Sequence, residues 1–465
     1  MRQTYAWSIA TITALTLLFF WIQVRAPHNW TGNWPPLQNY QTLTDALLRG
    51  DLSLAPAPQW LLELRDPYNR KERAEHPQEG EVWDLSLFAG KLYLYFGIAP
   101  VLAFFLPYKA LFDQHLPSAL VVFLSCSGAL IVAAGLLWRV SSRMKAAIAL
   151  PPLESFLAFY APFLVLGCGG MQGVLLGRTH IYELAISCGA LFVMIALFAL
   201  VREHEAASPK WRILAGACAG LAVGCRPHLG VGLSVLFLYS FACHYRERSL
   251  RENVVCATQL LAPFVLFVGT YAVYNWARFG NPLEFGVHYQ LGVVDPRHTA
   301  FMSWQYLGKN LVDSFFAAPS HLPYFPWLGV VDQLISAPAD ARPALIHVQR
   351  LSVFMAIPFT IWSLYYVMYA YSSSTKVPAV GRIAFTYCFA FAVSTLITLA
   401  SFFAMHPRYL ADYALPLCVA ASIGWLQFWC ASEEKSGLPQ VLRMLSLLAL
   451  FVSIYFGAVV LALAY

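Results

Sequence analysis

Apolar stretches of about 20 residues recur along this chain, and they restrict its possible folds more than any other feature of the sequence. One such stretch covers residues 5–24, and a similar one covers residues 181–201. An α-helix needs about 20 residues to cross the roughly 30 Å hydrocarbon core of a bilayer. In addition, only 12% of the 465 residues are charged, whereas a typical soluble domain has about 25%. The sequence therefore predicts an all-α polytopic membrane protein.

Eleven transmembrane spans are expected, in a single transmembrane domain over residues 1–465. The first apolar stretch could instead be a signal peptide, but residues 23–25, Gln-Val-Arg, match a small-x-small cleavage site poorly. We therefore interpret it as the first span. The expected spans cover about residues 5–24, 118–138, 147–168, 181–201, 211–226, 227–245, 254–275, 351–370, 383–404, 409–430 and 441–463.

Short loops rich in Lys and Arg separate several spans and predict the orientation of the chain. Such loops remain on the cytoplasmic side, so we expect a cytoplasmic N-terminus in a multi-pass protein of the cytoplasmic (inner) membrane. The formal net charge of +6 arises mostly from these loops and does not indicate a nucleic-acid partner. The basic residues are Arg139, Arg143, Lys145, Arg202, Lys210, Arg212, Arg246, Arg248, Arg251, Lys376, Arg382, Lys435 and Arg443.

Residues 211–245 test this topology, because they are too long for one span. A single helix over this stretch would be about 52 Å long at 1.5 Å per residue. Basic loops flank the stretch on both sides, which requires an even number of crossings. Pro227 lies in its middle and interrupts a helix. We therefore expect a tight hairpin of two spans, with Arg226 and His228 at its outer tip.

Two long loops are expected on the outer side, at residues 25–117 and 276–350. Within the first, residues 93–112 are apolar enough to span, but Pro100 and Pro107 interrupt them. If they crossed the membrane, the polar loop before them would become cytoplasmic, so we expect an interfacial or re-entrant helix. In the second loop an amphipathic surface helix is expected, because apolar residues recur at helical spacing at Trp304, Leu307, Leu311 and Phe315.

With this topology, the side chains able to carry chemistry fall on the outer face of the membrane. Ionisable groups at the ends of membrane helices are unfavourable unless they are paired or hydrated, so they are candidates for a functional site. Any one of them is more often an interface residue or a structural ion pair, but here six separate segments contribute. The candidates are Asp66, Asp84, Lys91, Arg178, Tyr182, Glu183, Arg226, His228, Arg278, His406, Arg408, Tyr409 and Asp412.

The cations of this set suit a phosphate at headgroup depth, because the planar fork of Arg binds phosphate oxygens. A carboxylate beside these cations could deprotonate a hydroxyl or hold a divalent metal. Together these groups predict transfer from a lipid phosphate to the hydroxyl of an acceptor, which can be a glycan, a lipid or a protein. The residues expected to bind the donor phosphate are Lys91, Arg178, Arg226 and Arg408.

Several other kinds of chemistry lack their sequence motifs. The chain has no Walker A loop, GxSxG elbow or HExxH helix, so nucleotide, lipase-type and zinc-protease chemistry are not indicated. The 10 cysteines lie in or at the ends of apolar segments and form no CxxC pair or Cys/His cluster. Neither a zinc site nor a disulfide framework is therefore expected.

Short motifs are spread over most of the chain, from about residue 40 to residue 415. They are Asp66-Pro67-Tyr68, Trp83-Asp84-Leu85-Ser86, Gly90-Lys91-Leu92-Tyr93-Leu94-Tyr95-Phe96-Gly97, Tyr182-Glu183, Arg226-Pro227, Tyr274-Asn275, Arg278-Phe279-Gly280-Asn281-Pro282, and Arg408-Tyr409 with Asp412. By their order and spacing the chain resembles bacterial membrane proteins of the GT-C glycosyltransferase superfamily, which use polyprenyl-phosphate sugars.

The resemblance implies a GT-C-like bundle of about 11 transmembrane helices. In such a bundle a large first outer loop bears the catalytic acid and precedes an interfacial helix. The resemblance also implies inverting transfer of a sugar from a lipid-linked donor, with a carboxylate as general base. A divalent metal, Mg²⁺ or Mn²⁺, often assists in this family; its ligands in this chain are left open.

The chain departs from the family at one position that bears on the base. Relatives commonly carry an acidic residue just before the tyrosine that matches Tyr40, whereas residues 38–39 are Gln-Asn here. We therefore expect Asp84, near Lys91 and the interfacial helix, to be the catalytic base. Asp66 is the second candidate.

Two other classes of function are open to a polytopic membrane protein. A transporter or flippase of lipid-linked sugars should carry ionisable or broken-helix sites near the bilayer midplane, often in repeated halves. Spans 118–138, 351–370 and 441–463 have no ionisable side chains at their centres, and no internal repeat is visible. A non-catalytic scaffold or assembly partner would need no clustered outer charges. The sequence therefore favours a glycosyltransferase over both alternatives.

Overall fold

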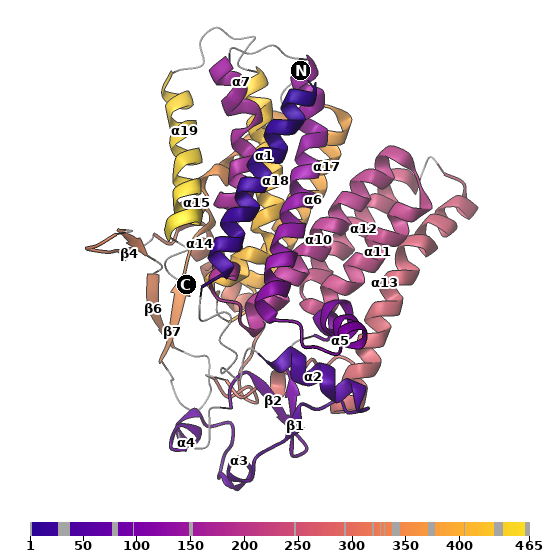
Figure 1. Cartoon of the computed structure of the whole chain (residues 1–465), viewed down its shortest axis with the longest axis vertical. Helices are drawn as coiled ribbons and strands as arrows, with labels where there is room; N and C mark the ends of the chain where they lie inside the picture. Colours follow the sequence, from indigo (N-terminus) through magenta and orange to yellow (C-terminus); the bar gives the residue numbers. More distant parts are fainter. Residues whose placement is uncertain are drawn as a thin grey trace.

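Long apolar helices make up most of the molecule and lie side by side along its length (Figure 1). The computed structural model describes residues 2–26, 38–76, 82–95, 97–147, 152–245, 248–292, 294–318, 320–325, 327–329, 331–336, 345–370, 377–403, 405–431 and 440–460. Within these ranges, seven helices are long and apolar enough to cross a membrane. The predicted polytopic, mainly helical fold is therefore confirmed.

Six of the seven long helices run without a break, and one is segmented. The unbroken ones are α1 (Arg2–Val24), α6 (Ser118–Ala147), α10 (Ile181–Ala206), α13 (Leu250–Phe279), α17 (Ala379–Ala400) and α18 (Pro407–Ala431). The segmented one, Leu153–Gly177, comprises α7 (Pro152–Phe159), α8 (Ala161–Leu164), a π-helical turn (Val165–Gly169) and α9 (Gln172–Gly177). Gly167 in this turn packs against Thr16 of α1 so closely that a Cβ would clash.

The other four predicted spans fall on shorter or interrupted helices, so the count of eleven spans stays a prediction. These are α11 (Pro209–Cys225), α12 (Leu229–Tyr245), the pair α15 (Val353–Ala356) and α16 (Ile361–Ala370) joined by a 3-10 turn (Pro358–Thr360), and α19 (Gln440–Tyr455) followed by a π-helical turn (Phe456–Val460).

The predicted hairpin within residues 211–245 is present in the structure. α11 ends at Cys225 and α12 begins at Leu229, so the break contains Pro227. Proline lacks the N–H that would continue the helical hydrogen bonds. Gly216 of α11 lies so close to the Leu260 carbonyl of α13 that no Cβ would fit. This close approach packs the middle of α11 against α13.

The first outer loop contains a small sheet that the all-α prediction did not include. Its antiparallel strands lie in the order β1, β3, β2. Leu61, Leu87, Leu92 and Leu291 are buried in a second hydrophobic cluster beside it, separate from the main helical core. The elements of this loop are α2 (Asn39–Leu48), β1 (Ala55–Pro56), α3 (Gln59–Glu63), α4 (Arg70–Ala74), β2 (Leu85–Phe88) and β3 (Lys91–Leu94).

Residues 93–112 are only partly helical, which corrects the prediction for their first half. Tyr93 and Leu94 belong to β3, because they pair with Ser86 and Leu85 of β2. The helical part begins with a π-helical turn (Val101–Phe105) and continues as α5 (Leu106–Phe112). At 1.5 Å per residue it is about 18 Å long, too short to cross a core of about 30 Å. It packs against α2 near the end of the bundle (Figure 1), so its length fits the predicted interfacial position.

The second outer loop contains the predicted amphipathic helix, α14 (Trp304–Phe316). Asn310 on this helix donates hydrogen bonds to the carbonyl oxygens of Ala400 (2.9 Å) and Phe402 (2.7 Å), at the end of α17. These bonds hold α14 against the bundle. Other elements of this loop are a 3-10 turn (Val287–Tyr289) and the antiparallel pairs β4 (Ser320–His321) with β5 (Leu328–Gly329) and β6 (Val331–Ser336) with β7 (Leu345–Arg350).

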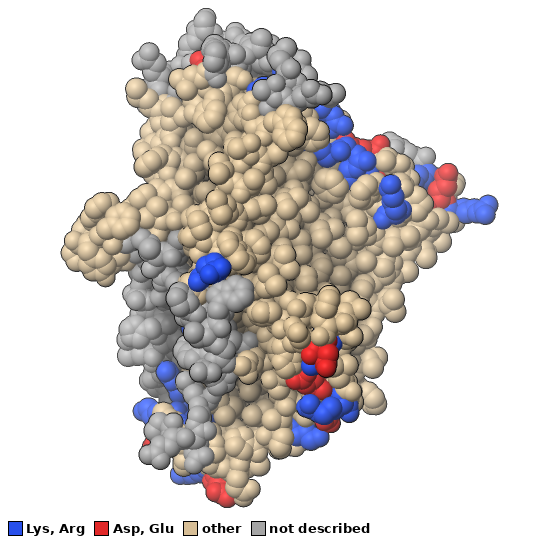
Figure 2. Space-filling model, in the orientation of Figure 1, with Lys and Arg blue, Asp and Glu red and all other residues tan. Residues whose placement is uncertain are grey.

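Charged side chains gather toward the two ends of the molecule, with a mostly uncharged surface between them (Figure 2). At the end away from the outer loops, Glu205 pairs with Arg139, Arg143 and Arg202 at 2.6, 2.9 and 2.9 Å. This is the end that the positive-inside rule assigns to the cytoplasm. Three residues of the predicted basic loops lie outside the described ranges: Arg246, Lys376 and Lys435.

Candidate active site

Asp84 lies just before β2 in a backbone conformation that is rare for a residue with a side chain. Its φ is 55°, in the left-handed region. Its N–H donates to the Leu291 carbonyl (2.9 Å), and the Leu291 N–H donates to the Leu85 carbonyl (2.8 Å). Non-glycine residues in this region carry strain and are found disproportionately at functional sites. The two outer loops thus hold Asp84 in one orientation.

Two neutral donors bind the same oxygen of the Asp84 carboxylate. The Tyr182 hydroxyl, at the start of α10, donates to Oδ1 at 2.7 Å, and Gln290 Nε2 donates to Oδ1 at 2.8 Å. Burial raises the pKa of Asp84, while these two hydrogen bonds and the charges of Arg408 and Arg178 oppose the rise. A raised pKa suits a general base near neutral pH. Among the described residues Oδ2 has no hydrogen-bond partner, so it can accept a proton from a ligand.

Arg408, in the first turn of α18, stacks on the ring of Tyr182. Its guanidinium carbon is 3.7 Å from the centroid of the Tyr182 ring. Its Nη1 is 3.9 Å from Glu183 Oε1, a separation too long for a hydrogen bond. Arg408 Nε and Glu183 Oε2 are buried without a hydrogen-bond partner in the described part of the chain. The guanidinium therefore retains donors for an anionic ligand.

Arg178 brings a second positive charge to this site. It follows α9, its side chain is exposed, and its Nε donates to His180 Nδ1 at 3.1 Å. Its charge helps to lower the pKa of both Asp84 and His406, so it lies near enough to act on both. An exposed arginine beside a carboxylate can reach a ligand that enters from solvent.

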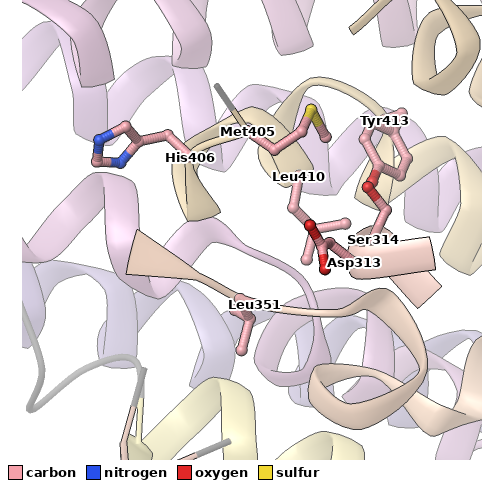
Figure 3. Close-up of a pocket in the computed structure, with 7 residues that line it drawn as sticks. All are labelled: Asp313, Ser314, Leu351, Met405, His406, Leu410 and Tyr413. Atoms are coloured by element: carbon pink, nitrogen blue, oxygen red, sulfur yellow. The ribbon is translucent and has the colours of Figure 1, made fainter. Parts of the chain in front are cut away.

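His406 precedes α18 and is neutral at physiological pH. Burial is the largest cause that lowers its pKa to about 3, followed by the charges of Arg408 and Arg178. Its ring points away from the other side chains around a neighbouring pocket (Figure 3). Those side chains belong to Asp313, Ser314, Leu351, Met405, Leu410 and Tyr413.

A second, buried group of charges lies beside Arg408. Arg226, after α11, and His228, before α12, both contact Asp412 Oδ2, at 3.1 and 3.2 Å. The Tyr409 ring centroid is 5.2 Å from the guanidinium carbon of Arg226 and 6.0 Å from that of Arg408. Since Asp412 matches its charge, Arg226 is held within the bundle.

The structure thus brings most of the predicted residues to one end of the bundle, at the start of α10, the end of α11 and the start of α18. They are Asp84, Arg178, Tyr182, Glu183, Arg226, His228, His406, Arg408, Tyr409 and Asp412. The other three predicted residues, Lys91, Asp66 and Arg278, lie elsewhere.

Lys91 is not beside Asp84, which corrects that part of the prediction. The strand register pairs Leu85 with Leu94 and Phe88 with Lys91. Lys91 is therefore at the far end of the hairpin from Asp84, about 10 Å along β3 from Leu94 at 3.3 Å per residue. Its side chain is exposed. The structure separates it from the two arginines that flank Asp84.

Asp66 joins the two outer loops and does not face Asp84. Both of its oxygens accept hydrogen bonds from Arg297 Nη2, at 2.9 and 2.8 Å. Arg297 also pairs with Asp295 at 2.6 Å and lies 4.4 Å from the Tyr68 ring centroid. These contacts satisfy the Asp66 carboxylate, so which of the two aspartates is the base stays a prediction.

Arg278 supports the hairpin that carries Asp84. It is buried at the end of α13, where Nη1 donates to the Leu94 carbonyl (2.9 Å) and Nη2 donates to Asn275 Oδ1 (2.6 Å). Its guanidinium carbon is also 3.9 Å from the Tyr274 ring centroid. Arg278 therefore fixes the end of β3 and acts on the site through the backbone.

Sequence reasoning assigned no role to Gln290 or Tyr95. Gln290 is an uncharged residue in a long loop, and no pattern around it marks a site. Tyr95 belongs to one of the motifs quoted above, and only the fold shows that it interacts electrostatically with Asp84 and Arg408. Burial raises the pKa of the Tyr95 hydroxyl, which therefore stays protonated and can donate a hydrogen bond.

The residues around Asp84 do not fit a protein-held divalent metal. Within the described ranges, no three His, Cys, Asp or Glu side chains are grouped closely enough to hold a metal ion. The neighbours of Asp84 are a phenol, an amide and guanidinium groups, whereas Mg²⁺ and Mn²⁺ prefer several oxygen ligands. The positive charge at the site comes from Arg408 and Arg178.

Comparison with known proteins gave one structural similarity. No protein-family model and no curated protein sequence matches the chain. Among solved structures, the chain is similar to the crystal structure of ArnT from Cupriavidus metallidurans bound to undecaprenyl phosphate, at 13% sequence identity and a TM-score of 0.42. The alignment covers 90% of this chain and 59% of that chain. The assignment of the site therefore rests on the geometry of this chain itself.

Proposed function

We propose that this protein is a membrane glycosyltransferase that moves a sugar from a polyprenyl-phosphate donor to an acceptor hydroxyl. One observation carries the proposal. The Asp84 carboxylate, with one oxygen held by Tyr182 and Gln290, lies next to the partly buried guanidinium of Arg408, which retains donors for an anion. A base beside an anion-binding cation is what transfer from a phosphate to a hydroxyl requires.

In the proposed reaction Asp84 acts as the general base. Its Oδ2 accepts the proton of the acceptor hydroxyl as the hydroxyl oxygen attacks the anomeric carbon of the sugar. The bond between that carbon and the phosphate oxygen breaks, and the phosphate leaves with the electron pair. The products are a glycoside of inverted configuration and the polyprenyl phosphate. The acceptor can be a glycan, a lipid or a protein.

Arg408 and Arg178 bind the departing phosphate in this scheme. The Tyr182 ring stacks on Arg408 and orients it, since 3.7 Å is a close cation–π separation. Preorganised cations at the leaving group lower the barrier because its charge grows in the transition state. Arg226, whose charge Asp412 matches, holds the Tyr409 ring through a cation–π contact at 5.2 Å.

A lipid-linked donor also agrees with the position of the site in the membrane fold. The site residues lie at the outer ends of α10, α11 and α18, away from the cluster of arginines around Glu205. By the positive-inside rule that cluster is cytoplasmic. The proposed enzyme therefore works on the outer face of the cytoplasmic membrane, with its N-terminus inside.

The test uses purified protein in lipid with a panel of radiolabelled polyprenyl-phosphate sugars. Wild-type protein should transfer the label, or hydrolyse the donor slowly without an acceptor. Asp84→Asn should reduce kcat by about 10²- to 10⁴-fold, and Arg408→Ala by about 10²- to 10³-fold. Asp51→Asn is the matched control, because Asp51 is exposed outside the site. A labelled lipid that crosses the bilayer of vesicles without any turnover would instead show a transporter.

A further inference from the structure

A short stretch of the second outer loop pairs with the start of β2. Ser86 and Gln290 form an antiparallel bridge, and the Ser86 hydroxyl donates to the Gly286 carbonyl at 2.8 Å. Leu291, the next residue, exchanges backbone hydrogen bonds with Asp84 (2.9 Å) and Leu85 (2.8 Å). These main-chain contacts place the Gln290 side chain beside Asp84 without any help from its own polar group.

The first outer loop holds this stretch from the other side. Arg73 Nη2 donates to the Gly292 carbonyl at 2.8 Å, and Arg73 Nη1 donates to the Pro67 carbonyl at 2.7 Å. Asp66, the residue before Pro67, binds Arg297. The residues on both sides of Gln290 are thus tied down, and its amide is presented to the site from a backbone with little freedom to move.

The Gln290 amide completes a triangle with Asp84 and Tyr182. Its Nε2 is 2.8 Å from Asp84 Oδ1 and 3.2 Å from the Tyr182 hydroxyl oxygen, while the Tyr182 hydroxyl is 2.7 Å from Asp84 Oδ1. An ionised carboxylate only accepts hydrogen bonds, so the amide nitrogen, and not the amide oxygen, must face it. Both donors converge on a single carboxylate oxygen.

We propose that Gln290 is a positioning residue that orients the Asp84 carboxylate so that Oδ2 faces the acceptor hydroxyl. This inference rests on the function proposed above. A carboxylate rotates about its Cβ–Cγ bond, and two donors on one oxygen fix that rotation. A catalytic group held in its productive geometry needs less reorganisation when the reaction occurs. Gln290 does this without adding charge, so it leaves the arginines to bind the phosphate.

The charged and titratable groups around Asp84 come from four elements. Arg408 faces it from α18, Tyr182 from the start of α10, Arg178 from the end of α9, and Tyr95 from the residue after β3. Tyr182 donates a hydrogen bond, and Arg408 and Arg178 are cations, so all three favour ionised Asp84. Loss of the Gln290 hydrogen bond removes one of two direct contacts to the carboxylate and should make Asp84 harder to ionise.

Two substitutions in the full-length protein in lipid test the proposal. Gln290→Met keeps the length of the side chain and removes the donor, so kcat should fall by about tenfold, as for loss of a hydrogen bond to a charged group. The acid limb of the profile of kcat/KM against pH should move to higher pH, with the donor KM unchanged. Gln290→Glu keeps shape and packing but adds a second carboxyl group, so it should move the limb further in the same direction.

Gln305→Met is the matched control, because Gln305 is exposed at the start of α14 and the substitution should leave the profile unchanged. Thermal unfolding of each variant checks that it is folded. If wild-type protein transfers sugar and Asp84→Asn does not, but both Gln290 variants keep the wild-type kcat and acid limb, the role of Gln290 is overturned and the function stands. If wild-type protein transfers nothing from any donor, the proposed function fails first.

Discussion

The guanidinium of Arg408 stacks on the ring of Tyr182, with 3.7 Å between the guanidinium carbon and the ring centroid. The hydroxyl of the same ring donates to Asp84 Oδ1 at 2.7 Å. One side chain therefore touches both the proposed phosphate-binding cation and the proposed base. Through Tyr182, the positions of the two groups relative to each other depend on the packing of α10 against α18.

Substitution of Tyr182 should separate its two roles. Tyr182→Phe keeps the ring beneath Arg408 and loses the hydrogen bond to Asp84, so kcat should fall by about tenfold with little change in the donor KM. Tyr182→Leu loses the ring as well, so the donor KM should also rise. Steady-state kinetics with a varied donor concentration measure both effects. An unchanged kcat in Tyr182→Phe would contradict a role for this hydrogen bond.

The rate should fall as the pH is lowered, with an acid limb above the usual range of an aspartate. Burial raises the pKa of Asp84, and a protonated Asp84 cannot accept the hydroxyl proton. The pKa of His406 is about 3, so this histidine stays neutral across the working range and should not contribute to the limb. Profiles of kcat/KM against pH for wild type and His406→Gln should have the same acid limb. A limb that disappears in His406→Gln would make the histidine the titrating group.

Asp66 should behave as a structural residue. Its pair with Arg297 is partly exposed, with side-chain exposures of 33% and 39%, and such pairs contribute less than about 1 kcal/mol. Asp66→Asn should therefore lower the melting temperature slightly and leave most of the activity. Activity lost in Asp66→Asn to the same extent as in Asp84→Asn would make Asp66 the base.

The buried pair between Arg226 and Asp412 should matter more for stability. Their side chains are 8% and 0% exposed, so Asp412→Asn leaves a buried guanidinium with an unmatched charge. Breaking one partner of a buried pair destabilises by about 3–5 kcal/mol, whereas replacing both by apolar residues is often near neutral. The double variant Arg226→Met with Asp412→Leu should therefore melt above Asp412→Asn in the same detergent. Equal melting temperatures for wild type and Asp412→Asn would contradict this account.

Removal of divalent metals should have little effect on the rate. Arg408 and Arg178 supply positive charge at the site, and the described residues around Asp84 do not form a metal-binding set. Transfer assays after treatment with EDTA, compared with assays in added Mg²⁺ or Mn²⁺, measure the dependence directly. A rate that EDTA abolishes and Mg²⁺ restores would show that the donor phosphate brings a metal to the site.

The sequence by itself determined the membrane fold, because lipid offers the backbone no hydrogen-bond partners and so requires long apolar helices. It also predicted the hairpin at Pro227, since proline cannot continue a helix and the flanking basic loops require two crossings. The same rules predict an outer position for Arg226, Tyr182 and Arg408.

The register of the small sheet could not be predicted from the sequence. β2 and β3 have four residues each and β1 has two, too few for a clear alternation pattern. The pairing of Phe88 with Lys91 places the lysine at the far end of the hairpin from Asp84, although the two are only a few residues apart in the sequence. Nearness along the chain is therefore a poor guide to which side chains lie beside Asp84.

Only the tertiary structure decided which polar residue meets which. Asp66 and Asp84 are both loop aspartates in the sequence, yet one binds Arg297 and the other binds Tyr182 and Gln290. Gln290 lies 206 positions from Asp84, and it reaches the carboxylate because the second outer loop bonds to the start of β2. Contacts between such distant segments depend on how loops pack after the helices have assembled, and local sequence patterns carry no information about that step.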